Sequence, residues 1–341
     1  MNSIKIAVLG AGSWGTALGI LLEGKGHKVN LWMRDEKQHQ EITDTRNTKY
    51  LPGIKVPEGI KLFTDLEGAL ADADLILTTV PSQAVRGVIH NGRPYIKDHQ
   101  IIVNAAKGIE INSLLRISEV IKEELPRNPF VCLSGPSHAE EVCKGMPTTV
   151  VVASESRETA EFVQDVFITP SFRVYTNPDL TGVELGGALK NVIAFGAGIS
   201  DGLGYGDNAK AALMTRGIRE IARLGSKMGT NLATFAGLTG IGDLIVTCTS
   251  VHSRNRRAGI LLGEGNSLEE TLSKVGMVVE GITTTKAAYQ LAKNYNIEMP
   301  ITEEIYKVIN NEIDARDAVT NLMSRDKTHE MEEVVNTDIN W

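Results

Sequence analysis

The stretch Ile4-Lys5-Ile6-Ala7-Val8-Leu9-Gly10-Ala11-Gly12-Ser13-Trp14-Gly15 decides the fold of this chain, because an apolar run of strand length leads directly into a glycine-rich loop. Residues 16–22 are largely apolar and suit a helix that packs on that strand. In such a loop Gly10 permits a tight turn, Gly12 lets a phosphate approach the backbone, and Gly15 lets the helix lie close to the strand. The free N–H groups at the start of the helix attract an anion. The pattern therefore predicts a loop that binds a dinucleotide pyrophosphate.

The composition is that of a globular protein with two domains. The 341 residues exceed what one core usually supports, and 42% of them are hydrophobic and 23% charged. We find no apolar run near the roughly 20 residues of a membrane span and no leader pattern before the glycine loop, so we expect a cytoplasmic protein without membrane insertion. The net charge of -7 argues against nucleic-acid binding, whereas the cluster Arg254-Asn255-Arg256-Arg257 indicates a small anion as ligand.

The cysteines and histidines show no pattern typical of a metal or redox site. Cys132, Cys143 and Cys248 lack CxxC spacing, so we expect reduced, packed thiols. His138 and Glu141 lie at helical spacing but supply only two of the three or four ligands that zinc needs. The sequence therefore predicts no metal.

Apolar runs of strand length recur through the first half of the chain. They lie at residues 29–33, 75–80, 101–105, 130–133, 149–153 and 172–175, with helical segments between them. This alternation predicts a doubly wound parallel sheet of Rossmann type, in which ligands bind beyond the carboxyl ends of the strands. That edge is expected to collect Gly10, Arg34, Pro81, Lys107 and Ser134-Gly135.

The pattern changes after Asn177-Pro178-Asp179, where we find no further strand. Long segments rich in Ala, Leu, Lys and Glu predict helices at residues 180–195, 209–228, 255–262, 283–295 and 302–309. We therefore expect a dinucleotide-binding domain at residues 1–178 and an all-α substrate-binding domain at residues 179–341.

Two lysines differ from ordinary surface lysines in their surroundings. Lys107 follows a predicted strand end, and Lys190 lies in an apolar helix one turn after Gly186-Gly187. Burial or a neighbouring cation lowers a lysine pKa toward neutrality, which suits proton transfer. Asp243, among glycine and apolar neighbours, either orients such a lysine or caps residues 244–247.

Three short segments each allow a structural and a functional interpretation. Ser137 and Glu140 have the spacing of a capping box, while Gly135 and the helix start beside them suit a ligand oxygen. Arg254-Asn255 follows the capping candidate Ser253 and suits phosphate oxygens and hydroxyls, or forms a solvated helix start. Arg34-Asp35 offers an arginine for the 2′-phosphate of NADP and an acid for the ribose of NAD, and the arginine favours NADPH.

Blocks of sequence in order along nearly the whole chain carry a family resemblance. They are Gly10-Ala-Gly-Ser-Trp-Gly-Thr-Ala17, Leu31-Trp-Met-Arg-Asp35, Ala106-Lys-Gly108, Ser134-Gly-Pro-Ser137, Leu185-Gly-Gly-Ala-Leu-Lys-Asn-Val-Ile193, Gly240-Ile-Gly-Asp243, Ser253-Arg-Asn-Arg-Arg257 and Val278-Val-Glu-Gly281. Together they resemble bacterial NAD(P)-dependent glycerol-3-phosphate dehydrogenases. The resemblance implies reversible reduction of dihydroxyacetone phosphate to sn-glycerol 3-phosphate for glycerophospholipid synthesis, NADPH as cofactor with NADH as the alternative, and a homodimer.

The resemblance also implies roles for single residues. Lys190 matches the family's proton-transfer lysine, and Lys107 matches a second lysine that contacts substrate and cofactor. The remaining substrate positions are Gly135, Ser137, Asp243, Ser253, Arg254 and Asn255. The cofactor positions, beside Lys107 and Arg254, are Gly10, Gly12, Ser13, Trp14, Gly15, Arg34, Tyr50, Ala139, Val278 and Glu280.

Two other functions fit parts of the pattern. A dehydrogenase of the 3-hydroxyacyl-CoA, 2-ketopantoate or 6-phosphogluconate type also joins a Rossmann domain to a helical domain, but the arginine segment favours a phosphorylated triose. A nucleotide-sensing module would bind the cofactor without turning over a substrate, and it would not need Lys107 or Lys190.

Overall fold

The computed structural model describes residues 2–327 and 330 of the chain. By internal contacts the chain divides into two units, Met1–Glu184 and Leu185–Trp341. Helix α8 (Leu180–Gly202) begins in the first unit and continues through the division into the second. The boundary that the sequence predicts, between residues 178 and 179, falls just before this helix and stays a prediction.

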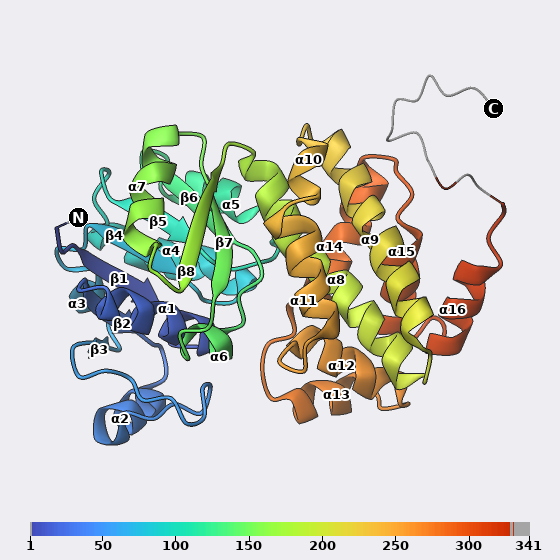
Figure 1. The fold of residues 1–341 in the computed structure, drawn as a ribbon, viewed down its shortest axis with the longest axis horizontal. Helices are drawn as coiled ribbons and strands as arrows, with labels where there is room; N and C mark the ends of the chain where they lie inside the picture. The colour runs from blue at the N-terminus through green and yellow to red at the C-terminus, as the bar shows by residue number, and fades with distance from the viewer. Residues whose placement is uncertain (1, 328–329, 331–341) are drawn as a thin grey trace. The chain divides into compact units, whose positions relative to one another are not determined.

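One eight-stranded sheet, of order β3-β2-β1-β4-β5-β6-β7-β8, forms the centre of the first unit (Figure 1). Its strands are β1 (Lys5–Leu9), β2 (Lys28–Trp32), β3 (Lys61–Phe63), β4 (Leu75–Thr78), β5 (Ile101–Asn104), β6 (Phe130–Ser134), β7 (Thr148–Ala153) and β8 (Phe172–Asn177). The order runs outward from β1 on both sides, and in such a sheet the crevice for ligands lies at the carboxyl ends beside that reversal. The predicted Rossmann-type fold is confirmed.

Two details of the sheet differ from the prediction. β3, with only three residues, was not predicted, because its short Lys-Leu-Phe segment lacks the alternating pattern of a strand. β7 runs antiparallel to β6, with Cys132 opposite Ala153, so the sheet is not wholly parallel. The connection between these strands holds only the four-residue α6 (Ala139–Val142), which is too short for a helical crossover.

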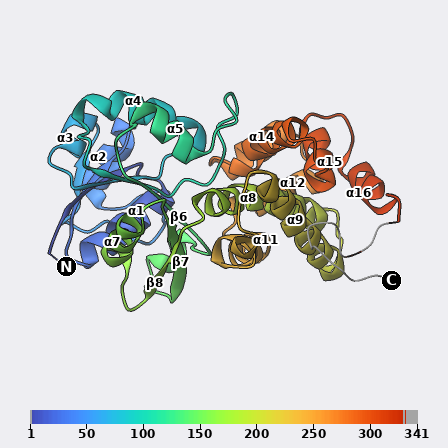
Figure 2. The same cartoon turned by 90° about the horizontal axis from the view of Figure 1, so that it is seen from above.

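Helices cover both faces of the sheet. They are α1 (Ser13–Gly24), α2 (Glu36–Thr45), α3 (Leu66–Leu70), α4 (Val85–Gly92), α5 (Ile117–Glu124), α7 (Arg157–Phe167) and the short turns η1 (Ser82–Ala84) and η2 (Arg93–Tyr95). Figure 2 shows α3, α4 and α5 on one face and α1 and α7 on the other. Separate apolar clusters lie under the two layers, one containing Leu18 and Phe167 and the other containing Ile89 and Ile121. The sheet is therefore buried from both sides.

The second unit is helical throughout its described residues. Beyond α8 it contains α9 (Asp207–Lys227), α10 (Leu232–Phe235), the π turn η3 (Leu238–Gly242), α11 (Asp243–Thr249), α12 (Arg254–Gly263), α13 (Leu268–Val275), α14 (Glu280–Asn294), α15 (Pro300–Ile309) and α16 (Ala315–Met323). The predicted all-α class is confirmed. The predicted helices did not include α10, η3, α11, α13 or α16, although Ser267 and Glu270 form a capping box at the start of α13 that the sequence displays.

One stretch, Leu232–Thr249, is long and apolar enough by length and composition to cross a membrane. In the structure it is divided into α10, η3 and α11, and it carries the buried carboxylate of Asp243. A paired, buried acid in a broken helix is typical of the interior of a folded unit. The stretch is therefore not a membrane span.

Candidate active site residues in the two units

The glycine loop of the first unit has the geometry that its sequence predicts. Gly10 adopts a φ of +119°, and its carbonyl accepts a hydrogen bond of 2.8 Å from the Thr79 hydroxyl. A β-carbon on Gly15 would lie 1.8 Å from the Gly10 carbonyl oxygen, so only glycine fits there. A β-carbon on Gly12, in contrast, would meet no protein atom within 4 Å. The loop therefore packs tightly against the start of α1 at Gly15, and it leaves unoccupied space beside Gly12.

This loop fits the phosphates of a dinucleotide. Gly12 precedes the 12-residue α1, and Ser13 and Trp14 are its first two residues, so the N–H groups of the first turn have no intrahelical acceptors. The open space at Gly12 lets an anion approach these groups. Both Ser13 and Trp14 are only partly buried.

A second cluster of predicted residues meets at the carbonyl group of Gly135, beyond β6. The Lys107 ammonium donates to this oxygen at 2.9 Å, and the Ser137 hydroxyl donates to it at 3.0 Å. Gly135 has a φ of +125°, and a β-carbon there would lie 3.0 Å from the Val150 Cα, so the position requires glycine. The first unit therefore brings together Lys107, Gly135 and Ser137.

The capping-box interpretation of Ser137 and Glu140 is wrong. His138 occupies the N-cap position of α6 without a side-chain capping hydrogen bond, and the Ser137 hydroxyl donates to the Gly135 carbonyl instead. Ala139, a predicted cofactor position, is the first residue of α6 and is buried. The start of this helix therefore lies next to the Gly135 cluster in sequence.

The residues that follow β2 include a helix cap and two predicted cofactor positions. Asp35 caps α2, because its carboxylate accepts a hydrogen bond of 2.9 Å from the Lys37 N–H. Arg34 is exposed, and Tyr50 lies half-buried in the loop after α2. The side chains of Arg34 and Asp35 are both exposed, but the Asp35 carboxylate is engaged as the cap of α2.

In the second unit, Lys190 lies in a buried ion pair on α8. Its side chain is 7% exposed and that of Asp243 is 1% exposed, and its ammonium donates to the Asp243 carboxylate. The ammonium also donates to the Thr247 hydroxyl at 2.7 Å, and that hydroxyl donates to the Asp243 backbone carbonyl at 2.6 Å. Of the two interpretations of Asp243, the one in which it orients a lysine is therefore correct.

The arginine segment lies at the start of α12, close to the predicted positions after α13. Ser253 caps α12 through its hydroxyl, as predicted, by accepting a 3.2 Å hydrogen bond from the Arg256 N–H. The Arg254 guanidinium donates to the Val278 carbonyl at 3.3 Å. Val278 is 46% exposed, and Glu280 is the first residue of α14. The second unit therefore groups Arg254 with Val278.

Asn255 connects three segments through its side-chain amide. Its Nδ2 donates to the Asn191 Oδ1 at 2.9 Å, and its Oδ1 accepts from the Gly281 N–H at 2.8 Å. Asn191 directly follows Lys190, so Asn255 ties the lysine helix to the starts of α12 and α14. Asn191 and Thr247 were not among the residues that the sequence predicted for the site. Thr247 lies one helical turn after Asp243, which is the one signal that points to it.

The three thiols lie in surroundings that raise their pKa values and keep them protonated. The three cysteines are free, and burial raises the pKa of Cys143 to about 11 and that of Cys248 to about 12. Among residues 2–327 and 330, no group of three or more His, Cys, Asp or Glu side chains has the arrangement of a metal site.

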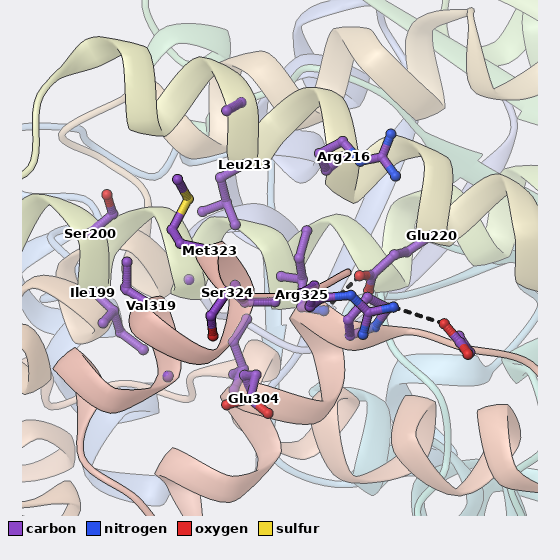
Figure 3. A pocket seen from close by; sticks show the side chains of 18 of the residues that line it. Ile199, Ser200, Leu213, Arg216, Glu220, Glu304, Val319, Met323, Ser324 and Arg325 are labelled. Atoms are coloured by element: carbon purple, nitrogen blue, oxygen red, sulfur yellow. Dashed lines mark hydrogen bonds and ion pairs between the residues drawn. The ribbon is translucent and has the colours of Figure 1, made fainter. Parts of the chain in front are cut away.

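A cavity of about 1430 Å³ lies among α9, α15 and α16 of the second unit, and Figure 3 shows Glu220 in its lining. No predicted site residue is among the described residues that line it. Glu220 accepts hydrogen bonds from the Ile301 N–H at 2.6 Å and the Thr302 N–H at 3.1 Å, and burial raises its pKa to about 7. This carboxyl group holds the start of α15.

Comparisons with known proteins point to the same enzyme family for both parts of the chain. The family model for the NAD-dependent glycerol-3-phosphate dehydrogenase N-terminus matches residues 5–160, and the model for the C-terminus matches residues 179–320. The glycerol-3-phosphate dehydrogenase (NAD(P)+) of Bacillus subtilis (strain 168) is 58% identical over 337 residues, which cover 98% of each chain. The corresponding protein of Pelotomaculum thermopropionicum is 58% identical over 334 residues, or 97% of this chain and 96% of the relative.

Solved structures lead to the same group of proteins. The crystal structure of glycerol-3-phosphate dehydrogenase from Coxiella burnetii has a TM-score of 0.92 and 40% identity, and the match covers 95% of this chain and 99% of that one. A ketopantoate reductase from Ralstonia eutropha has a TM-score of 0.62 at 15% identity. The second likeness extends to the fold alone.

Proposed function

We propose specific roles for the residues of this chain, which belongs to the NAD-dependent glycerol-3-phosphate dehydrogenase family and is an NAD(P)-dependent oxidoreductase. The reaction is the reversible reduction of dihydroxyacetone phosphate to sn-glycerol 3-phosphate. The buried Lys190–Asp243 pair is the observation that carries the assignment, because a held ammonium suits a ketone oxygen that gains negative charge.

Lys190 is the general acid in the reduction and the general base in the reverse direction. Asp243 and Thr247 both accept hydrogen bonds from its ammonium, and these contacts fix where the ammonium lies in the second unit. We assign the proton transfer to this ammonium because its position is fixed before the substrate binds. Such acid catalysis contributes on the order of 10²- to 10⁴-fold to the rate.

Arg254 binds the substrate phosphate, and Ser253 and Asn255 hold its helix start. A guanidinium matches phosphate oxygens in geometry as well as in charge. Asn255 already shares its amide with Asn191 and Gly281, so we assign it a positioning task in addition to the predicted substrate contact. Lys107, Gly135 and Ser137 form the substrate positions of the first unit.

The cofactor is NADPH, bound through the first unit at Gly10, Gly12, Ser13, Trp14, Gly15, Arg34, Tyr50, Lys107 and Ala139, with Arg254, Val278 and Glu280 as further contacts. When bound, it supplies the hydride. The exposed Arg34 supports a preference for the 2′-phosphate, since Asp35 is occupied as a helix cap.

The product serves as the backbone for glycerophospholipid synthesis, and we place the protein in the cytoplasm as a homodimer. The homodimer is tested by light scattering coupled to size-exclusion chromatography. A mass near twice the 36.9 kDa of one chain supports it, and a mass of one chain contradicts it.

The decisive experiment follows NADPH oxidation with dihydroxyacetone phosphate in Lys190→Ala and Lys190→Arg. Lys190→Arg keeps a cation beside Asp243 but does not release a proton near neutral pH, so we expect both variants to lose at least about 10²-fold in kcat. NADPH binding, measured by fluorescence, should stay intact. Lys227→Ala, at an exposed position on α9, is the control.

Alternative substrates separate the competing functions. Ketopantoate and acetoacetyl-CoA are offered to the wild-type protein beside dihydroxyacetone phosphate, and preference for either would overturn the assignment. Tight NADPH binding without any turnover would favour a nucleotide sensor. Turnover at the wild-type rate in Lys190→Arg would remove the role of Lys190.

A further inference from the structure

The first turn of α12 sends its side chains to different neighbours. Arg254 and Arg256 are two residues apart, which places them on opposite sides of a helix. Arg254 donates to Val278, whereas Arg256 is bound by Asp201 on α8. Arg257 is exposed. The cations of the Arg-Asn-Arg-Arg segment are therefore not equivalent, and Arg256 is directed away from Arg254.

Asp201 joins three helices through one carboxylate. Its Oδ2 accepts from both the Nε and the Nη2 of Arg256 at 2.7 Å. Its Oδ1 lies 2.8 Å from the ammonium of Lys210, in the first turn of α9. The three side chains are only 13–17% exposed, so water screens this cluster weakly. Both oxygens of Asp201 are thus engaged in holding α12 and α9 on α8.

The backbones of α8 and α12 lie in direct contact beside this cluster. A β-carbon on Gly198 would lie 2.1 Å from the Arg256 carbonyl oxygen, and one on Gly259 would lie 2.1 Å from the Phe195 carbonyl oxygen. Such contact fixes how far apart the two helices are, but smooth glycine surfaces do not fix how one helix slides or turns on the other. The Asp201–Arg256 pair supplies such a restraint at one end of the contact, and the Asn255–Asn191 hydrogen bond supplies another next to Lys190.

Lys190 lies on the same helix as Asp201. The two residues are separated by about 16 Å along the axis, from a rise of 1.5 Å per residue. One rigid helix therefore carries the proton donor and the anchor of the turn that holds Arg254. The position of the Arg254 guanidinium relative to the Lys190 ammonium therefore depends on this anchor.

We propose that Asp201 is a positioning residue that holds the first turn of α12 in register with Lys190 and keeps Arg256 out of the phosphate site. This inference rests on the proposed function for the role of Arg254. It adds that the affinity of Arg254 for the substrate phosphate depends on the Asp201 carboxylate, which does not itself contact the substrate.

The test compares a substrate that has the phosphate with one that lacks it. In Asp201→Asn we expect kcat/KM for dihydroxyacetone phosphate to fall about tenfold, mainly through KM, because a misplaced binding group loses ground-state and transition-state contacts alike. The kcat/KM for dihydroxyacetone, which has no phosphate, should stay within about twofold of wild type. Damage to the whole fold would lower both values equally, and that outcome would overturn the proposal.

Two further variants sharpen the test. Asp207→Asn is the matched control, because Asp207 is fully exposed and lies 3.9 Å from the same Lys210 ammonium; wild-type kinetics are expected. Arg256→Met should reproduce the effect of Asp201→Asn. The double variant Asp201→Asn/Arg256→Met should have a kcat/KM no lower than that of the less active single variant. Additive losses in the double variant would show that the pair does not act as one unit.

A binding measurement separates this proposal from the reaction itself. Inorganic phosphate should raise the Tm of the wild type, and Asp201→Asn should need about tenfold more phosphate for the same rise. If the wild type fails to reduce dihydroxyacetone phosphate but keeps this difference, the proposed function is wrong and the role of Asp201 stands. An equal phosphate response in both proteins contradicts the role of Asp201.

Discussion

The two units prepare their ligand-binding groups by different physical means. In the first unit, the glycine loop and the Gly135 carbonyl are backbone features whose shapes follow from glycine residues that admit no β-carbon. In the second unit, Lys190 with Asp243 and Arg256 with Asp201 are charged side chains that hold one another in poorly hydrated surroundings. A glycine-built backbone site is disturbed mainly by added side-chain volume at the glycine. A buried ion pair is disturbed mainly by the loss of one of its charges. Substitutions of each kind therefore test this difference.

The largest effect is expected for Asp243→Asn, which leaves the buried Lys190 ammonium without its anion. Breaking a buried pair from one side costs about 3–5 kcal/mol, so the free energy of unfolding should fall by that amount in urea titrations. The kcat should also fall on the order of 10²-fold, since Lys190 loses its orientation. Thr247→Val removes the hydrogen bonds of this hydroxyl with the Lys190 ammonium and the Asp243 carbonyl, and it should cost about 1–2 kcal/mol. Equal stability losses in both variants would contradict the dominance of charge.

The counterpart in the first unit is a pair of glycine substitutions. Gly15→Ala places a β-carbon against the Gly10 carbonyl and should cost about 1–3 kcal/mol of stability together with NADPH affinity. Gly12→Ala meets no protein atom, so its stability should stay within about 0.5 kcal/mol of wild type. NADPH affinity should still fall about tenfold, because the added methyl group occupies the approach of the phosphate. Unchanged affinity in Gly12→Ala would place the pyrophosphate elsewhere.

Glu220 tests whether buried charge in the second unit responds to pH. Its pKa of about 7 in the folded chain exceeds the ordinary value of 4.5, so the folded state holds its proton more tightly than the unfolded state does. The stability from this group is full below about pH 4.5 and is lost as the pH rises through about 7, by about 3 kcal/mol. Urea titrations at several pH values should show a steeper fall for the wild type than for Glu220→Gln. Glu298→Gln, at a side chain that is 78% exposed in the same cavity lining, should keep the wild-type slope.

The same contrast explains what the sequence could and could not predict. Gly10, Gly15 and Ser253 were predictable, because each acts within a few residues of its own position. Lys190 was noticeable as a charge in an apolar helix, and Asp243 as an acid among glycines. The partnership of Arg256 with Asp201, 55 residues earlier, was not predictable, since packing of distant helices decides it. The antiparallel β7 was missed for a similar reason: strand direction depends on the length of a connection rather than on the strand residues.

The smallest expected effect concerns cofactor choice at Arg34, whose side chain is exposed at the carboxyl end of the sheet. A charge-assisted hydrogen bond to the 2′-phosphate is weakened there by water, so Arg34→Ala should cost about 1 kcal/mol, or roughly fivefold in the KM for NADPH. The KM for NADH, which lacks that phosphate, should not change. Asp35→Asn is the control, because Asp35 caps α2, and it should lower stability slightly without altering the ratio of the two KM values. If the ratio of the KM for NADPH to the KM for NADH responds to Asp35→Asn and not to Arg34→Ala, the Asp35 carboxylate recognises the ribose. The first unit would then bind its cofactor through a side chain that also caps α2, and not through backbone geometry alone.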